Sequence, residues 1–160
     1  MFSHESEYRR SNFFTKKIVE FLVEYKKSNN IKLDVGDISI KRDIGYAEEY
    51  VDAIYLMMHK NKRQEYIVSS NTLNKLSDFI ESCLNLLEID FLVDDSDGEI
   101  NYIDKKNNFN FIFSNSKEFR RYDLKGVKGD NTKISNELGW APKYNLDEIS
   151  RKMIDYEIKK

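Results

Sequence analysis

Residues 120–142, RRYDLKGVKGDNTKISNELGWAP, combine a charged loop with a short helix whose two ends are marked in the sequence. Asp130 or Asn131 can cap the helix start, because a short side-chain oxygen accepts hydrogen bonds from the unpaired N–H groups of the first turn. Gly139 predicts where the helix ends, and Pro142 prevents it from restarting. The stretch therefore predicts a charged loop that is held in place by a short helix.

The helix is expected to pack by one apolar face, because Ile134 and Leu138 are four positions apart, and Trp140 is expected to lie beneath the turn. The loop before it contains Arg120 and Asp123. A guanidinium group matches two phosphate or carboxylate oxygens at once, so such a loop can present arginine to an anion. The alternative interpretation is that Arg120 is an ordinary solvated surface charge.

Length and charge narrow the class of protein. The 160 residues predict a single domain, 1–160, and the net charge of −2 leaves no broad basic field for nucleic acid. No apolar run approaches the ~20 residues of a membrane-spanning helix. One cysteine, Cys83, and two histidines give no disulfide and no metal-ligand spacing. We expect a cytoplasmic protein without a metal, a nucleic-acid partner or a membrane segment.

Hydrophobic spacing predicts alternating helices and strands, which is typical of an α/β fold. A helix is expected over 12–27, with Lys16 and Lys17 on its polar side. Its apolar stripe is expected to consist of Phe14, Ile18, Phe21, Leu22 and Tyr25. A hairpin-like pair is expected over 31–35 and 38–40. A second helix is expected after Gly45, with one apolar face directed inward. The members of that face are Ala47, Tyr50, Val51, Ile54, Tyr55 and Met58.

The remaining elements follow from the same patterns. Tyr66–Val68 is expected to be a buried strand, followed by a helix over 76–87 that Asn74 caps. Short strands are expected over 89–93 and 109–113 around the acidic run 94–98, which is interpreted as a solvated turn because a calcium loop would need a further Glu. Asn145 and Glu148 form a capping box for a final helix.

No P-loop, GxGxxG, GxSxG, HExxH or CxxC motif occurs in the chain. His4 and Glu5 are adjacent, but successive strand residues face opposite ways, so a shared acid/base site is not expected. From the residues alone, the chain is an α/β domain whose arginines are candidate anion ligands.

Three stretches occur in an order that resembles one family. They are HESEYRRSNFFTKKI from His4, RDIGYAEEYV from Arg42, and Arg120 with Asp123 followed by GDNTKISNELGWAPK. Together they resemble the C-terminal half of GDP-mannose 4,6-dehydratases, which are extended short-chain dehydrogenases/reductases of the NAD(P)-binding Rossmann superfamily. The resemblance implies an α/β C-terminal lobe without the Gly-rich Rossmann half.

This resemblance also implies roles for individual residues. Arg42 and Arg120 would hold the diphosphate of GDP-mannose, Lys17 would add a third cation, and Asp123 would accept bonds from the ribose. The family motif places Asn12 among the substrate-binding residues as well. His4 and Arg9 match positions that contact NADP, on a loop that reaches a neighbouring subunit. The implied partners are a nucleotide sugar and either further copies of the chain or a complementary N-terminal half.

The chain departs from the family pattern in ways that bear on activity. Relatives have Asn where this chain has Ser3, Pro-Arg where it has Glu7-Tyr8, and Glu where it has Asp123. The catalytic Thr, Glu and Tyr-x-x-x-Lys residues of the family lie upstream of the resemblance, so no catalytic residue is assigned here. We expect that the chain is a fragment or the product of a split or decayed gene. We also expect that it does not convert GDP-mannose to GDP-4-dehydro-6-deoxy-mannose by itself.

Two alternatives remain open at this point. One is a non-catalytic binding or assembly protein that kept the lobe and lost the chemistry, and the other is a different nucleotide-sugar epimerase or dehydratase. Turnover of GDP-mannose with NADP separates the enzyme from the binding protein. A comparison of GDP-, UDP- and dTDP-sugars separates the dehydratase from an epimerase.

Overall fold

The computed structural model describes residues 1–61, 63–96, 98–115 and 126–160. Within them, five helices and seven strands give the mixed α/β fold that the sequence predicted, although β5, β6 and β7 follow one another, as do α4 and α5. The elements are β1 (Ser3–Glu5), α1 (Phe14–Ser28), β2 (Leu33–Val35), β3 (Lys41–Tyr46), α2 (Ala47–Met58), β4 (Leu73–Lys75), α3 (Leu76–Leu86), β5 (Phe91–Ser96), β6 (Glu99–Asp104), β7 (Phe109–Ser114), α4 (Thr132–Leu138) and α5 (Leu146–Ile158).

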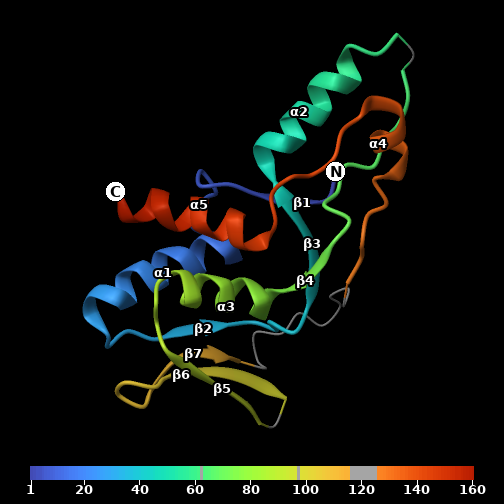
Figure 1. The fold of residues 1–160 in the computed structure, drawn as a ribbon. Helices are drawn as coiled ribbons and strands as arrows, with labels where there is room; N and C mark the ends of the chain where they lie inside the picture. Colours follow the sequence, from blue (N-terminus) through green and yellow to red (C-terminus); the bar gives the residue numbers. More distant parts are fainter. Residues whose placement is uncertain (62, 97, 116–125) are drawn as a thin grey trace.

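The strands form two separate sheets (Figure 1). In the three-stranded sheet, β3 lies between β1, to which it is parallel, and β4, to which it is antiparallel. In the four-stranded sheet the order is β2-β7-β6-β5, with only the β2–β7 pair parallel. Helices α1, α3 and α5 stack above the four-stranded sheet, whereas α2 and α4 lie at the other end of the molecule.

The main core lies between the four-stranded sheet and helices α1, α3 and α5. Ile18, Leu22 and Tyr25 of α1 are fully buried, which confirms the predicted apolar stripe of this helix. The Tyr25 ring stacks on Phe111 of β7 at 4.5 Å between centroids, and its hydroxyl donates a hydrogen bond to Asp104 over 2.9 Å. Sheet and helix are therefore joined by both apolar packing and a buried polar contact.

The predicted hairpin over 31–40 is wrong. β2 instead pairs in parallel with β7, far along the chain. The backbone carbonyls of residues 38–40 bind the start of α3 instead of a neighbouring strand. The Ile40 carbonyl accepts a hydrogen bond from the N–H of Leu76, and the Ile38 carbonyl accepts one from the N–H of Ser77, both over 2.9 Å. This segment thereby caps the start of α3 rather than forming a second strand.

Two further sequence interpretations near α3 are corrected. No strand forms over 66–68 in the described chain; Val68 is buried and its carbonyl accepts a single hydrogen bond from the N–H of Phe2. Asn74 lies in β4 and does not cap α3. Lys75 occupies the N-cap position of α3, and its N–H donates to the Asp78 carboxylate over 2.7 Å. The predicted turn over 94–98 is also partly wrong, because Asp94, Asp95 and Ser96 belong to β5.

The C-terminal elements match the sequence closely. Gly139 ends α4 in the left-handed conformation at φ 68°, and Asn145 and Glu148 form the predicted capping box of α5. Of the two proposed caps of α4, Asp130 accepts the N–H of Thr132 over 2.9 Å. The Asn131 amide instead donates to the carbonyl of Ser69, so it links α4 to a distant loop.

Helix α2 differs most from expectation. Tyr50 and Ala53 are buried in a second apolar cluster with Val68, Ile134 and Trp140. The Trp140 indole N–H donates to the carbonyl of Glu49 over 2.9 Å, which fixes α2 against the end of α4. The other members of the predicted inner face are exposed: Val51, Ile54, Tyr55 and Met58.

Candidate functional site

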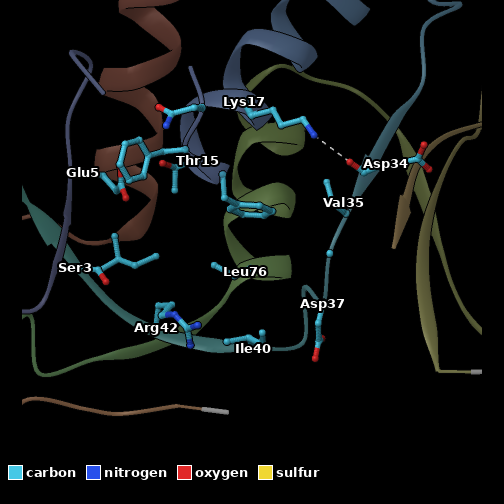
Figure 2. Close-up of a pocket in the computed structure, with 15 residues that line it drawn as sticks. Ser3, Glu5, Thr15, Lys17, Asp34, Val35, Asp37, Ile40, Arg42 and Leu76 are labelled. Atoms are coloured by element: carbon cyan, nitrogen blue, oxygen red, sulfur yellow. Dashed lines mark hydrogen bonds between the residues drawn. The ribbon is translucent and has the colours of Figure 1, made fainter. Parts of the chain in front are cut away.

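An open cleft of about 990 Å³ lies between β1, the start of α1, the end of β2 and the start of β3 (Figure 2). Its lining includes three of the residues that the sequence singled out, Asn12, Lys17 and Arg42. These come from the loop before α1, from the first turns of α1 and from β3. The structure therefore brings together residues from two of the three motifs.

Strand alternation explains why Arg42 belongs to the cleft. Successive side chains of a strand point to opposite sides, so Arg42 lines the cleft while Asp43 is buried on the other side. The Asp43 carboxylate accepts hydrogen bonds from the Ser70 N–H and hydroxyl, both at 2.7 Å, and from the backbone N–H groups of Asn71 and Gly129. Asp43 thus anchors β3 to two loops and fixes the strand that carries Arg42.

Helix α1 presents its N-terminal end to the cleft, because Phe14, Thr15 and Lys17 are all lining residues. Phe13 occupies the N-cap position, where it provides no side-chain hydrogen bond, and the first turn contains no acidic residue. The N–H groups at a helix N-terminus carry a partial positive charge and bind anions. The first turn of α1, Lys17 and Arg42 are therefore the positively charged groups of the cleft.

Carboxylates in the same cleft are engaged by neighbouring groups. Glu5, at the end of β1, is buried and its carboxylate lies 3.2 Å from the Arg9 guanidinium. Burial raises the pKa of the Glu5 carboxyl above its ordinary value. Asp37 accepts hydrogen bonds from the N–H and hydroxyl of Ser39 over 2.9 and 2.6 Å.

Lys17 donates to the backbone carbonyl of Asp34 over 3.2 Å, a contact that Figure 2 shows.

The two predicted cofactor-binding residues do not line the cleft. The His4 ring hydrogen-bonds through Nδ1 to the carbonyl of Phe2 at 2.9 Å and lies 5.1 Å from the Tyr50 ring. Arg9 pairs with Glu5 and stacks on Phe13, with 3.6 Å from its guanidinium carbon to the ring centroid. Since Glu5 and Phe13 are lining residues, Arg9 supports the wall of the cleft from behind.

The two other predicted substrate-binding residues, Arg120 and Asp123, lie outside the described residues. Sequence reasoning also missed several lining residues, among them Glu5, Thr15, Asp34 and Asp37. Glu5 had been considered only as a partner of His4. Its place in the cleft follows from the parallel pairing of β1 with β3, in which Glu5 lies opposite Tyr46. No signal in the local sequence reveals this pairing.

The described residues do not form a site for a whole dinucleotide cofactor. The sequence has no Gly-rich loop to hold a pyrophosphate, and His4 and Arg9 are occupied by contacts within the chain. Among the described residues, no group of three or more His, Cys, Asp or Glu side chains could hold a metal ion. The groups of the cleft that could bind an anion are the Lys17 ammonium and the Arg42 guanidinium.

Comparison with solved structures places this fold in a class. RMD from Pseudomonas aeruginosa complexed with NADPH matches with a TM-score of 0.78 at 16% identity, over 98% of this chain and 46% of that chain. A dTDP-glucose 4,6-dehydratase from Bacillus anthracis in complex with NAD matches with a TM-score of 0.70 at 18% identity, over 99% of this chain and 43% of that chain. The fold is that of part of the extended short-chain dehydratases and epimerases.

The family itself is given by sequence. The family model for GDP-mannose 4,6 dehydratase matches residues 1–153, so the chain belongs to that family. GDP-mannose 4,6 dehydratase 1 of Arabidopsis thaliana is 27% identical over 99% of this chain and 39% of its own length. The human GDP-mannose 4,6 dehydratase is 25% identical over 99% of this chain and 42% of its own length. The chain spans about two fifths of these curated relatives.

Among the described residues, no helix is long and apolar enough to cross a membrane.

Proposed function

We propose that this chain is the C-terminal, substrate-binding part of a GDP-mannose 4,6-dehydratase and that its cleft holds the diphosphate of GDP-mannose. The observation that carries the proposal is the convergence of Lys17, Arg42 and the uncapped N-terminus of α1 on one open cleft. A diphosphate has about two negative charges and several acceptor oxygens, which such a set of donors matches. Membership of the family supports the choice of a nucleotide sugar.

The remaining residues take supporting roles in this proposal. Asn12 lies in the same lining and offers an amide to the sugar or phosphate. The family resemblance assigns Arg120 to the diphosphate and Asp123 to the ribose, and the proposal includes both residues. The order of the motifs along the sequence supports the assignment to the C-terminal half.

Dehydration itself is proposed to require the Gly-rich half of the family fold and its catalytic residues, to which no residue of this sequence is assigned. NADP would be held mostly by a Gly-rich half, with His4 and Arg9 making secondary contacts once rearranged. The solved relatives with NADPH or NAD bound are more than twice as long as the matched part. This chain alone is expected to bind substrate without converting it.

Titration calorimetry with GDP-mannose tests the binding proposal. Lys17→Ala and Arg42→Ala should each weaken binding about tenfold, because a charge-assisted bond to phosphate contributes roughly 1.5 to 3 kcal/mol. In the double variant the loss of affinity should be smaller than the product of the two single-variant losses, since both residues are proposed to contact one diphosphate. Lys27→Ala is the matched control, because Lys27 is an exposed lysine at the other end of α1.

Arg120→Ala should weaken binding to a similar degree. If GDP-mannose binds the wild type and all three single variants equally well, the site assignment is wrong. If UDP-glucuronic acid binds and GDP-mannose does not, the epimerase alternative is favoured, since a UDP-glucuronic acid 4-epimerase from Bacillus cereus shares the fold with a TM-score of 0.69. Formation of a 4-keto product by the purified chain with NADP would contradict the proposed lack of activity.

A further inference from the structure

Helix α1 contains a buried lysine that the proposed function does not use. Lys16 lies between the cleft residues Thr15 and Lys17 in the sequence, but its own side chain is buried and does not line the cleft. Burying an ammonium group is costly unless acceptors surround it. The partners of Lys16 therefore indicate what this side chain does.

The Lys16 ammonium joins two parts of the chain that are far apart in sequence. It donates to the Glu157 carboxylate over 2.6 Å and to the backbone carbonyl of Glu7 over 3.2 Å. Its nitrogen also lies 5.2 Å from the ring centroid of Tyr156, a distance at which a cation is attracted to an aromatic face. The last turn of α5 and the loop after β1 are thus held at one point of α1.

The loop concerned, residues 6–11, connects two residues that line the cleft, Glu5 and Asn12. It runs beside α5 (Figure 1), where the Tyr8 ring meets the Tyr156 ring edge to face with 5.3 Å between centroids. Loop and helix are therefore in contact through rings as well as through the ammonium group. We refer to the four side chains of this contact as the α5 clasp: Tyr8, Lys16, Tyr156 and Glu157.

Two further contacts hold other parts of the same loop. The Glu7 carboxylate accepts a hydrogen bond from the Tyr46 hydroxyl over 3.0 Å, and the Ser11 hydroxyl donates to Glu20 over 2.7 Å. The Ser11 contact is exposed, whereas Lys16 is buried, and a charge-assisted hydrogen bond is stronger in a buried environment than in water. The clasp is therefore expected to be the strongest of these restraints.

We propose that Lys16 is a positioning residue, which through the α5 clasp holds the loop of residues 6–11, and with it Asn12, in place beside the cleft. The inference rests on the proposed function for the role of the cleft and adds the last turn of α5 to what the site requires. The family model matches residues 1–153, so two members of the clasp lie beyond the match. Loss of the clasp should lower the affinity of the cleft without removing a group that contacts the ligand.

Amide hydrogen exchange without nucleotide, followed by mass spectrometry, tests whether the clasp restrains the loop. The main variant combines Lys16→Met with Glu157→Gln, because replacing both partners of a buried ion pair leaves no unpaired buried charge. Peptides that cover residues 6–11 should exchange roughly 5- to 30-fold faster than in the wild type, since the loop opens more often. Circular dichroism melting checks that the fold is retained.

The matched control combines Lys60→Met with Glu137→Gln. It removes another Lys–Glu ion pair, between the segment after α2 and helix α4, and should leave the exchange of residues 6–11 unchanged. If the control accelerates these amides as much as the main variant does, the effect is not specific to the clasp and the proposal is overturned.

Two single variants separate positioning from general stability. Tyr8→Ala removes a ring that is 74% exposed, so it tests the clasp even if the double variant does not fold, and it should accelerate exchange of the loop about 2- to 10-fold. Lys16→Arg keeps a cation that can donate to both oxygens, so the loop should exchange at close to the wild-type rate. Wild-type exchange in Tyr8→Ala, or fast exchange in Lys16→Arg, would contradict the proposal.

Titration calorimetry with GDP-mannose then tests the consequence for the cleft. The folded double variant should bind about 3- to 10-fold more weakly, because apparent affinity falls with the fraction of chains whose loop is in place. A double variant that is folded but exchanges its loop like the wild type, or that binds GDP-mannose equally well, would overturn the proposal. If the wild type does not bind GDP-mannose, the proposed function fails, whereas the exchange experiment still decides whether the clasp holds the loop.

Discussion

The Lys16 ammonium donates a hydrogen bond to the Glu157 carboxylate over 2.6 Å and joins the first turn of α1 to the last turn of α5. The Lys16 side chain is only 3% exposed, although its helical position predicted a solvated face. It also donates to the carbonyl of Glu7 over 3.2 Å, so it holds the loop before α1 in place. That loop leads to Asn12 and the wall of the cleft.

Removal of Glu157 should be strongly destabilising. Glu157→Ala leaves the Lys16 ammonium buried without its counter-ion, and breaking a buried pair in this way costs about 3 to 5 kcal/mol. Urea unfolding followed by circular dichroism measures the effect. Glu24→Ala in α1, where the carboxylate is exposed, is the control and should change stability by less than about 0.5 kcal/mol. Equal stabilities of the two variants would show that the buried pair contributes nothing.

The same pair predicts a pH dependence. Burial raises the pKa of the Glu157 carboxyl, but the hydrogen bond and charge of Lys16 outweigh this effect, and the pKa lies below its ordinary value of 4.5. A lowered pKa in the folded state contributes stability that is fully present above the unfolded value and is lost as pH falls through the folded value. The difference in unfolding free energy between wild type and Glu157→Ala should therefore shrink below pH 4.5. A difference that stays constant down to pH 3 would contradict this prediction.

Substitution of Asp43 should show a graded effect. Asp43→Ala leaves the backbone N–H groups of Ser70, Asn71 and Gly129 without their acceptor. The Gly129 N–H is buried, and a buried donor left unsatisfied costs about 1 to 3 kcal/mol. Asp43→Asn keeps one oxygen and should be intermediate. Thermal unfolding should rank wild type above Asp43→Asn and Asp43→Asn above Asp43→Ala. Because β3 carries Arg42, GDP-mannose affinity should follow the same order.

Gly45 should not tolerate a side chain. A Cβ at this position would lie 2.4 Å from Cε1 of Tyr50, so Gly45→Ala should cost about 1 to 3 kcal/mol from overpacking. Tyr50→Leu removes the clashing ring but opens a cavity, and costs energy by itself. The double variant should therefore lose less stability than the sum of the single losses. Additive losses would mean that the strand shifts away from α2 without contacting Tyr50.

Local sequence signals were sufficient to place the helices along the chain and to mark the end of α4 and the start of α5. The stripe of Ile18, Leu22 and Tyr25, the stop at Gly139 and the capping box of Asn145 all depend on residues within a few positions of one another. The physical causes are equally local, because helix periodicity and terminal hydrogen bonds are set along a single segment. Family motifs added the candidate residues Asn12, Lys17 and Arg42, which the fold then collected in one cleft.

Strand pairing was decided only by the tertiary structure. β2 pairs with β7 and β1 with β3 across long stretches of chain, and a strand sequence does not specify which partner will supply its hydrogen bonds. Burial of polar residues has the same origin: Lys16 is buried because Glu157 of α5 meets it. Helix α2 shows the converse, since its helical spacing predicted an inward apolar face, whereas Val51, Ile54, Tyr55 and Met58 of that face are exposed.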